Sequence, residues 1–473
     1  MNETTLPLNG TSQNATTATV LVHGWVSGPD VRGSWDIIWS SFMAIFLCTW
    51  TAICLNIPHP KDRTIHILLR KTKWMFWAVI APEIVLSIAM GQYASARRSV
   101  RRFKGLECEG WTLRHGFFAD MGGFLLQPKD STPFLVNSRQ MAYLVEREYI
   151  QCPTITEEEI WDKSKADSLS KLITAAQATW LLFQLGGRAV LKLPTTTLEL
   201  SAGAIVLCSF GTFICWLHKP SDAKSGVTIT TRFTTAQILL DAGPIAAQPY
   251  VHTPLDFVSR ESPTCGFNMM GFFNLRCDDP ERPLRRFPND RFPDIATFEK
   301  IALFLITTAY AAFHLIGWNF TFPSRVETQL WRWSSVVVTG ATIFFWVFET
   351  IAARQRFGRW DKYLIWLRLK KKPADQATST ATRQDSETGS DVERALKTGG
   401  VVRQDTVLRM DAFEEEMKKA KPIVFWEVAI LFPFILLYVV ARAYLIVEVF
   451  VSLRELPAGV YKTFEVAEII PHW

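Results

Sequence analysis

Residues 422–450 read PIVFWEVAILFPFILLYVVARAYLIVEVF, an apolar run whose charged residues are Glu427, Arg442 and Glu448. A helix of this length can cross the hydrocarbon core of a bilayer, which is about 30 Å thick. Six further stretches are candidate membrane segments: Trp35–Ile57, Trp74–Tyr93, Leu172–Leu191, Leu198–Leu217, Phe298–Trp318 and Trp333–Ala353. Apolar residues are gathered into these blocks and most charges lie between them, which is typical of a multi-pass membrane protein.

We therefore expect an all-α fold, a polytopic transmembrane helical bundle with six or seven membrane segments and long loops. The expected organisation is a disordered, glycosylated tail over 1–34, a transmembrane region over 35–353 with long loops at 94–170 and 218–297, a basic and then disordered cytosolic linker over 354–421, and a final transmembrane helix and tail over 422–473. The lipid bilayer is then the first partner of the chain.

Tryptophan and charge agree with this class. The chain has 18 tryptophans, many at the ends of the apolar stretches, where amphipathic rings prefer the bilayer interface. The net charge of +6 does not indicate nucleic-acid binding, because the basic residues cluster beside the apolar stretches, as they do near anionic lipid.

The two ends of the sequence predict an orientation. Three N-glycosylation sequons begin at Asn2, Asn9 and Asn14, and a fourth begins at Asn319. Glycans are added in the secretory pathway, so the sequons predict an amino terminus outside the cytosol. Residues 58–73 and 354–372 are rich in lysine and arginine, which favours the cytosolic side. We expect a multi-pass protein of the secretory pathway or the plasma membrane.

This orientation limits the number of crossings. An outside start and a cytosolic linker require an odd number of crossings before residue 354, whereas six candidates precede it. Either Trp74–Tyr93 or Leu172–Leu191 should therefore fail to cross. Trp74–Tyr93 contains Pro82 and precedes five basic residues between 97 and 104, and Leu172–Leu191 carries several polar side chains. The sequence leaves this choice open.

The cysteines fall into two groups. Cys48, Cys54, Cys208 and Cys215 lie in apolar stretches, where cysteine behaves as a small apolar residue. Two further pairs, Cys108 with Cys152 and Cys265 with Cys277, lie in the expected loops and can bridge in an oxidising compartment. The sequence contains no CxxC and no other metal-ligand pattern, and it indicates no particular cofactor.

Charged side chains inside apolar stretches are candidate sites, because they are costly in lipid. Glu83 follows Pro82, which can kink a helix, and the carboxylate could form a proton, cation or substrate site. The alternative is a structural charge pair with Arg188 or Arg442. Arg442 lies deep in its stretch and needs a partner. A lone histidine, His314, is interpreted as a hydrogen-bonded core residue.

A second candidate is one helix face carrying Gln177, Gln184 and Arg188, together with Trp180. This face could line a pore or a substrate cavity. It could equally provide hydrogen bonds between helices, with Gly186 and its neighbour allowing close approach.

The third candidate lies in the expected loop 94–170. The run from Trp111 to Phe124 combines Arg114, His115 and Asp120 with a glycine pair, and these side chains could supply an acid–base pair. No nucleophile pattern accompanies them, so a packed aromatic loop at the membrane surface is the competing interpretation.

Several stretches together resemble a large, largely uncharacterised family of fungal multi-pass membrane proteins. The resemblance rests on Phe46-Leu-Cys-Thr-Trp-Thr-Ala-Ile53, Asn56-Ile-Pro-His-Pro60, Ile80-Ala-Pro-Glu83, His115-Gly-Phe-Phe-Ala-Asp-Met-Gly-Gly-Phe124, Leu193-Pro-Thr-Thr-Thr-Leu-Glu-Leu200, Trp216-Leu-His-Lys-Pro220, the run from Ala441 to Arg454 and the ending Pro471-His-Trp473. It implies a polytopic fungal membrane protein and suggests a link to secondary metabolism. It supplies no reaction and no catalytic residue.

The sequence thus leads to a multi-pass integral membrane protein of unassigned biochemical activity. The first alternative is a membrane-embedded enzyme acting on a small lipophilic metabolite, with Glu83, Arg114, His115 and Asp120 as candidate catalytic residues. The second alternative is a channel or transporter lined by Gln177, Gln184, Arg188 and Arg442.

Overall fold

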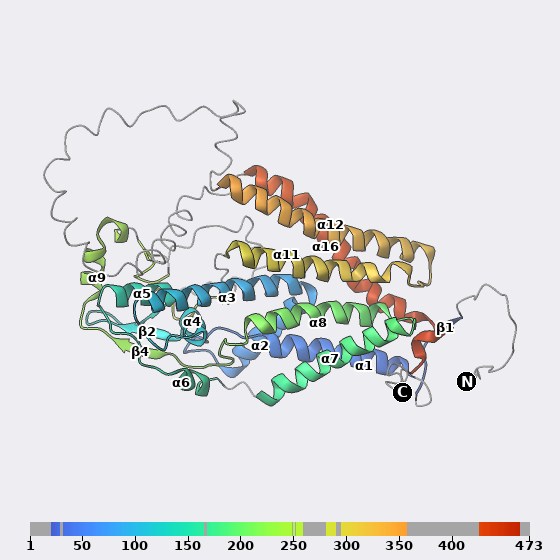
Figure 1. Ribbon diagram of the computed structural model, residues 1–473, viewed down its shortest axis with the longest axis horizontal. Helices are drawn as coiled ribbons and strands as arrows, with labels where there is room; N and C mark the ends of the chain where they lie inside the picture. The colour runs from blue at the N-terminus through green and yellow to red at the C-terminus, as the bar shows by residue number, and fades with distance from the viewer. Residues whose placement is uncertain are drawn as a thin grey trace, which may run out of the picture.

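The computed structural model describes residues 20–28, 32–164, 168–247, 249–250, 252–258, 281–289, 295–356 and 425–463. Within these residues the protein is mostly helical, as expected, and two small sheets are added. Long helices lie side by side in one bundle, and a smaller region of short helices and strands covers one end of it (Figure 1). The long helices are α1 (Ser34–Ala52), α2 (Thr64–Ile80), α3 (Pro82–Gly105), α7 (Ser168–Val190), α8 (Thr197–Cys215), α11 (Thr297–Phe313), α12 (Arg325–Arg356) and α16 (Phe425–Val451).

Contacts between distant parts of the chain define two ends of the bundle. At one end, which we call end A, Arg32 before α1 pairs with Glu199 in the first turn of α8. The same end holds the 3-10 helix η2 (His314–Asn319), which leads from α11 to α12. At the opposite end, end B, Lys219 after α8 donates a hydrogen bond to the side chain of Asn56, which follows α1. Helices α1, α8 and α12 run from end A to end B, and α7, α11 and α16 return (Figure 1).

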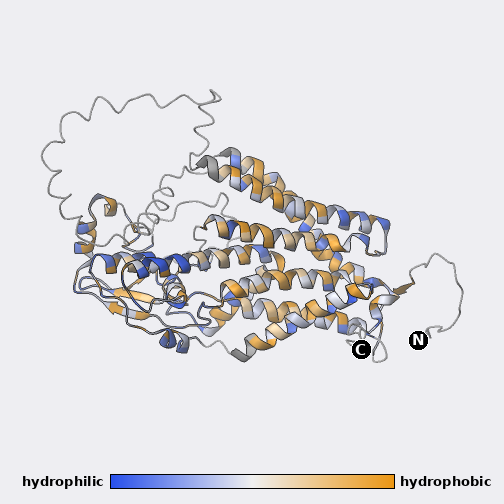
Figure 2. Cartoon of the chain, in the orientation of Figure 1, coloured by the Kyte–Doolittle hydropathy of each residue, from blue (hydrophilic) through white to orange (hydrophobic). Residues whose placement is uncertain are grey.

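Five stretches of described helix are long and apolar enough to cross a membrane: Ser34–Ala52, Thr197–Cys215, Thr297–Asn319, Arg325–Ala352 and Ala429–Arg454. The number is up to six if the bent pair of α2 and α3 is one span, against the six or seven expected. Helix α7, which contains most of Leu172–Leu191, runs along α1 and α8 but is not one of these stretches. Apolar residues dominate the bundle, whereas hydrophilic residues gather in the region at end B (Figure 2).

The pair of α2 and α3 explains the ambiguity of Trp74–Tyr93. The two helices meet at Ala81 with a bend of 114°, so this apolar stretch is two helices and not one. Pro82 has no N–H and opens α3, a position where proline is well tolerated. The start of α2 and the end of α3 both lie at end B, since Lys71 contacts Asp222 and Trp111 contacts Ser99 there.

The region at end B contains most of the residues expected in long loops. Its elements are α4 (Leu113–Asp120), β2 (Phe124–Gln127), β3 (Phe134–Val136), α5 (Ser138–Glu146), α6 (Glu157–Asp162), β4 (Val227–Thr230), α9 (Thr235–Ala242) and the 3-10 helix η1 (Gly243–Ala246). Strand β2 pairs antiparallel with β3 and parallel with β4. The buried rings of Phe103 and Trp111 stack at 3.7 Å in its core, and a disulfide joins Cys108 to Cys152.

Near the two termini, the chain closes end A with a small sheet. Strand β1 (Leu21–His23) pairs antiparallel with β5 (Glu455–Pro457), which follows α16 and the 3-10 helix η3 (Ser452–Arg454). A further 3-10 turn, η4 (Ala458–Tyr461), packs beside them, and Val460 and Tyr461 join Ile37 of α1 in a buried cluster. The described parts of both terminal segments therefore lie at the same end of the bundle.

Candidate functional site

A cluster of polar side chains lies inside the bundle, where α3, α8, α11 and α16 meet. Glu83 is in the first turn of α3, directly after the break, and its Oε1 accepts a hydrogen bond of 2.6 Å from the hydroxyl of Tyr438 on α16. Arg442 lies one turn further along α16 and is 6% exposed. The cluster thus joins the broken helix pair to the most apolar helix of the bundle.

Arg442 is held by three partners. Its Nη1 donates to Nε2 of His314 at 3.0 Å, its Nε donates to the carbonyl of Ile80 at 3.3 Å, and the guanidinium lies 5.1 Å from the ring centre of Tyr310. Because arginine can only donate, Nε2 of His314 is the acceptor, and Nδ1 carries the proton that reaches the carbonyl of Ala311. The break at Ala81 leaves the Ile80 carbonyl free for Arg442.

Two polar atoms of this cluster have no hydrogen-bond partner among the residues that the structure describes. These are Oε2 of Glu83 and the hydroxyl of Tyr310, and both are shielded from solvent. Tyr310 is 1% exposed. Glu83 and Arg442 interact electrostatically, yet no ion pair joins these two described side chains directly. Buried polar atoms without partners are uncommon in folded proteins, so the cluster has capacity for a further ligand.

The structure decides which of the two candidate arginines is the neighbour of Glu83. Arg442 is the arginine beside it, and Arg188 is not. His314, as expected, is a hydrogen-bonded core residue that is 1% exposed. The sequence missed Tyr310 and Tyr438. Both lie on apolar stretches among many aromatic residues, so nothing in their spacing marks them as polar neighbours of Glu83.

A small cavity lies beside the break between α2 and α3. Its volume is about 10 Å³, close to the space that one water molecule needs. Ala78, whose carbonyl loses its helical partner at Pro82, lines it, together with the hydroxyl residues Thr49, Ser209 and Thr212. The break therefore lies next to a small, partly polar space inside the bundle.

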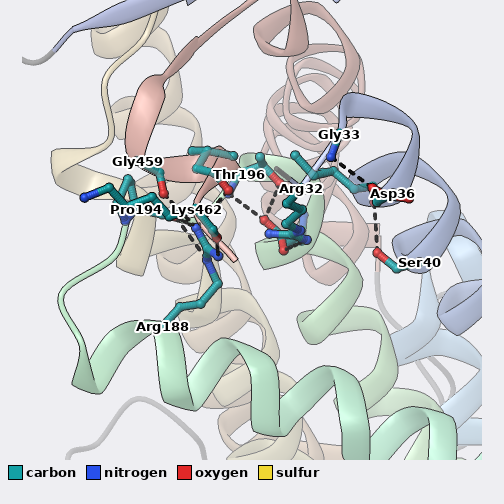
Figure 3. Close-up of polar contacts among 12 residues, drawn as sticks. Arg32, Gly33, Asp36, Ser40, Arg188, Pro194, Thr196, Gly459 and Lys462 are labelled. Carbon is teal, nitrogen blue, oxygen red and sulfur yellow. Dashed lines mark hydrogen bonds and ion pairs between the residues drawn. The ribbon is translucent and has the colours of Figure 1, made fainter. Parts of the chain in front are cut away.

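Arg188 lies at end A, apart from the cluster around Glu83, and binds backbone carbonyls there (Figure 3). The side chain is 2% exposed and donates to four backbone carbonyls, those of Pro194, Gly459, Val460 and Lys462. Four carbonyls around one planar guanidinium match its fixed fork of donors. Arg188 thereby ties the end of α7 to the segment after α16.

The other residues of the predicted α7 face do not share one environment with Arg188. Gln177 and Gln184 are partly buried, whereas Trp180 on the same face is 47% exposed. Helix α7 packs on α1 and α8 at the side of the bundle, and Arg442 lies in the separate cluster around Glu83. The four residues expected to line a pore are therefore not brought together.

The candidate acid–base residues in the region at end B each contact a different partner. His115 is 2% exposed, and its two ring nitrogens contact the Thr112 hydroxyl and the Ile155 carbonyl, both at 2.9 Å. Arg114 pairs with Glu157 at 3.5 Å, and Asp120 accepts hydrogen bonds from Ser95 and Ser138. All three residues lie on the short helix α4, packed in the region at end B, and the described residues give them no common partner.

A buried lysine at end B was also missed. Lys219 is 3% exposed, and its ammonium donates to Oδ1 of Asn56 at 3.0 Å and to Oε1 of Gln92 at 2.9 Å. Burial lowers the pKa of Lys219 to about 8, although Cys54 and Asp120 oppose this shift. The two amides come from the segment after α1 and from α3, so Lys219 joins both to the segment after α8.

The structure describes some of the asparagines expected to carry glycans and some of the cysteines expected to form disulfides. Asn319 is exposed at end A, whereas Asn2, Asn9 and Asn14 lie outside the described residues. Cys108 and Cys152 form the disulfide, and Cys265 and Cys277 also lie outside the described residues. Cys48, Cys54, Cys208 and Cys215 are buried and unbridged. Among the described residues, no group of three or more histidine, cysteine or acidic side chains could hold a metal ion.

Comparison with known proteins gives a family and no activity. No curated protein and no solved structure matches the chain. A family model described as a family of unknown function (DUF8562) matches residues 8–242, 298–380 and 403–473, which is most of the sequence and includes every residue of the cluster around Glu83. The chain therefore belongs to DUF8562, a family of unknown function.

Proposed function

We propose that this protein is a polytopic membrane transporter that couples its cycle to protons, with Glu83 as the proton-carrying group. In this proposal α1, α7, α8, α11, α12 and α16 cross the bilayer, and α2 and α3 enter from end B and return to it. The crossings before residue 354 then number five. This is the odd number that the charge pattern requires, and Trp74–Tyr93 is the segment that does not cross.

The observation that carries the proposal is a carboxylate at a helix break inside an apolar bundle. Ionisable groups at membrane depth are costly and usually serve a pathway or a binding site. Broken helices at this depth are tolerated where protein or a polar cavity surrounds the free backbone groups, and transporters use them to build sites. Glu83, the freed Ile80 carbonyl and the small cavity beside Ala78 meet these conditions.

Glu83 is suited to alternate between two charge states. When Glu83 is ionised, its negative charge balances the positive charge of Arg442, and its Oε1 accepts the hydrogen bond from Tyr438. When it is protonated, the unpartnered Oε2 can carry the proton without breaking that hydrogen bond. The proton can therefore be taken up within the existing packing.

The test is proton movement in proteoliposomes that contain the purified full-length chain and an internal pH-sensitive dye. An imposed pH gradient should dissipate faster than in empty liposomes, and Glu83→Gln should abolish this difference. Glu448→Gln is the matched control, because Glu448 is a buried glutamate on α16 that lies outside the cluster and contacts Tyr444. Equal proton flux in the wild type, Glu83→Gln and empty liposomes would overturn the proposal.

We orient end A outside the cytosol. Asn319 is exposed at this end, and the three amino-terminal sequons precede β1 there. Basic residues of 58–73 and 97–104 gather at end B, which favours the cytosol. The Cys108–Cys152 disulfide, also at end B, favours the opposite orientation, because disulfides persist in oxidising compartments.

Glycosidase treatment separates these two orientations. In the proposed orientation the protein from cells shifts in mass on treatment, and a variant with all four sequon asparagines changed to glutamine does not shift. An unshifted wild type whose Cys108 and Cys152 resist alkylation until they are reduced would instead place end B outside. The link to secondary metabolism, which rests on the fungal resemblance, is tested by the metabolite profile of a deletion strain.

A further inference from the structure

We infer that the cluster around Glu83 is an anion site, which takes up one small monovalent anion together with one proton. The inference rests on the proposed function and extends it to the class of substrate. It stands on the placement of Arg442, Tyr310 and Tyr438 around the one carboxylate of the cluster.

The charges of the cluster lead to this coupling. The guanidinium of Arg442 stays protonated, and Glu83 is the acidic side chain whose charge acts on it from the described surroundings. A proton on Glu83 leaves the guanidinium without a counter-charge inside an apolar bundle, which is unfavourable. An anion beside Arg442 restores neutrality. Proton and anion therefore favour each other's binding, and the loaded site has the same net charge as the empty one.

The donors of the cluster suit an anion and not a metal cation. The Tyr310 hydroxyl is buried and has no partner within the described part of the chain, and its ring lies under the Arg442 guanidinium. Tyr438, on the turn before Arg442, keeps its hydroxyl proton on Glu83 and so leaves the Tyr310 hydroxyl and the guanidinium as the donors for an anion. A cation at this place would have to share Glu83 with a fixed arginine, whereas an anion meets hydroxyl and guanidinium donors.

The groups that face Glu83 come from every helix packed against it. They are Tyr438 and Arg442 on α16, Tyr310 on α11 and Cys208 on α8, and His314 at the end of α11 contacts Arg442. Glu83 is the acid among them. A pH dependence of anion binding is therefore assigned to Glu83.

The size of the anion follows from the packing. Leu86, Leu303 and Tyr310 are buried in the packed core that α3 and α11 contribute beside the cluster. An ion close to water in size can be accommodated by small shifts of these side chains, whereas a large organic anion cannot. Chloride is the probe of choice, and gluconate is the bulky anion that replaces it at constant ionic strength.

The test is isothermal titration of chloride into the purified full-length protein between pH 5 and 8. Linkage predicts that the dissociation constant rises with pH, by up to about tenfold per unit once Glu83 is ionised in the free protein. Binding should take up one proton, seen as a dependence of the measured heat on the ionisation enthalpy of the buffer. Chloride binding that is independent of pH, or that takes up no proton, would overturn the inference.

Three variants assign the effect to the cluster. Glu83→Gln should bind chloride with a dissociation constant independent of pH, because the amide imitates the protonated acid. Arg442→Met should lose binding at every pH. Tyr310→Phe keeps the packing and should bind several-fold more weakly, which keeps the inference testable if Arg442→Met does not fold. Glu448→Gln is the control and should behave as the wild type.

The two proposals fail separately. Glu83-dependent proton flux in proteoliposomes without chloride binding would overturn the anion site and leave proton coupling intact. Chloride binding linked to a proton, without any flux, would overturn transport and leave the site.

Discussion

Tyr438 on α16 donates a hydrogen bond of 2.6 Å to Glu83, the residue that follows the proline at the break between α2 and α3. This contact joins parts of the chain that are 355 residues apart in sequence. The same helix turn places Arg442 against the Ile80 carbonyl on the other side of the break. Helix α16 therefore holds the bent pair in place from both sides.

Tyr438→Phe tests this contact. Removal of the hydroxyl costs a hydrogen bond to a carboxylate, and we expect a loss of about 1 kcal/mol in the free energy of unfolding. Denaturation of the purified protein in detergent measures the loss. In a Glu83→Met background the same substitution should cost much less, because the acceptor is gone. An equal loss in both backgrounds would show that the contact contributes nothing.

Arg188→Lys should destabilise end A. A lysine ammonium is a point charge and cannot donate to the carbonyls of Pro194, Gly459, Val460 and Lys462 at once. Buried carbonyls left unpaired should lower the free energy of unfolding by about 2 kcal/mol. Faster proteolysis in the segment after α16 should accompany the loss. Arg325→Lys, at an exposed arginine of the same end, is the control and should leave both measurements unchanged.

Lys219 should make stability depend on pH above neutrality. Its pKa is about 8 in the folded protein and 10.5 by its ordinary value, so below pH 8 the cost of burying the charge is fully present. Between pH 8 and 10.5 the folded state releases the proton first, and stability should rise by about 3 kcal/mol relative to Lys219→Met. Unfolding of both proteins across this range measures the difference. Parallel pH profiles would contradict the prediction.

The Cys108–Cys152 disulfide should stabilise the region at end B. The two cysteines are 44 residues apart, and a loop of this length corresponds to about 4 kcal/mol through restriction of the unfolded chain. A reducing agent should therefore lower the unfolding temperature of the wild type. The Cys108→Ser/Cys152→Ser double variant should already be destabilised and should not respond. A reductant effect of equal size in both proteins would assign it to another site.

The helical class and most bundle helices were predictable from the sequence. The stretches Trp35–Ile57, Leu198–Leu217, Phe298–Trp318 and Pro422–Phe450 closely match helices of the structure, because long apolar runs carry a strong local signal. Strands β2, β3 and β4 were not anticipated. Each is three or four residues long, and β2 finds β4 only across about a hundred residues, so no local pattern announces the pairing.

The candidate site was predicted in one respect and not in others. Glu83 and Arg442 stand out in sequence because charges are rare in apolar stretches. The choice between Arg442 and Arg188 as the neighbour of Glu83 depends on which helices pack together, which sequence spacing does not contain. Arg114, His115 and Asp120 lie close in sequence, yet each turns to a different partner in the fold.

The sequence by itself determined that this chain has long apolar helices, a proline at residue 82 and a carboxylate directly after it. These are local properties, set by hydropathy and by the chemistry of the proline ring. The tertiary structure decided that the proline marks a bend of 114°, that both arms of the bend return to end B, and that Tyr438, Tyr310 and Arg442 surround Glu83. These features depend on contacts between helices from opposite ends of the sequence. Such helices become neighbours only in the folded bundle.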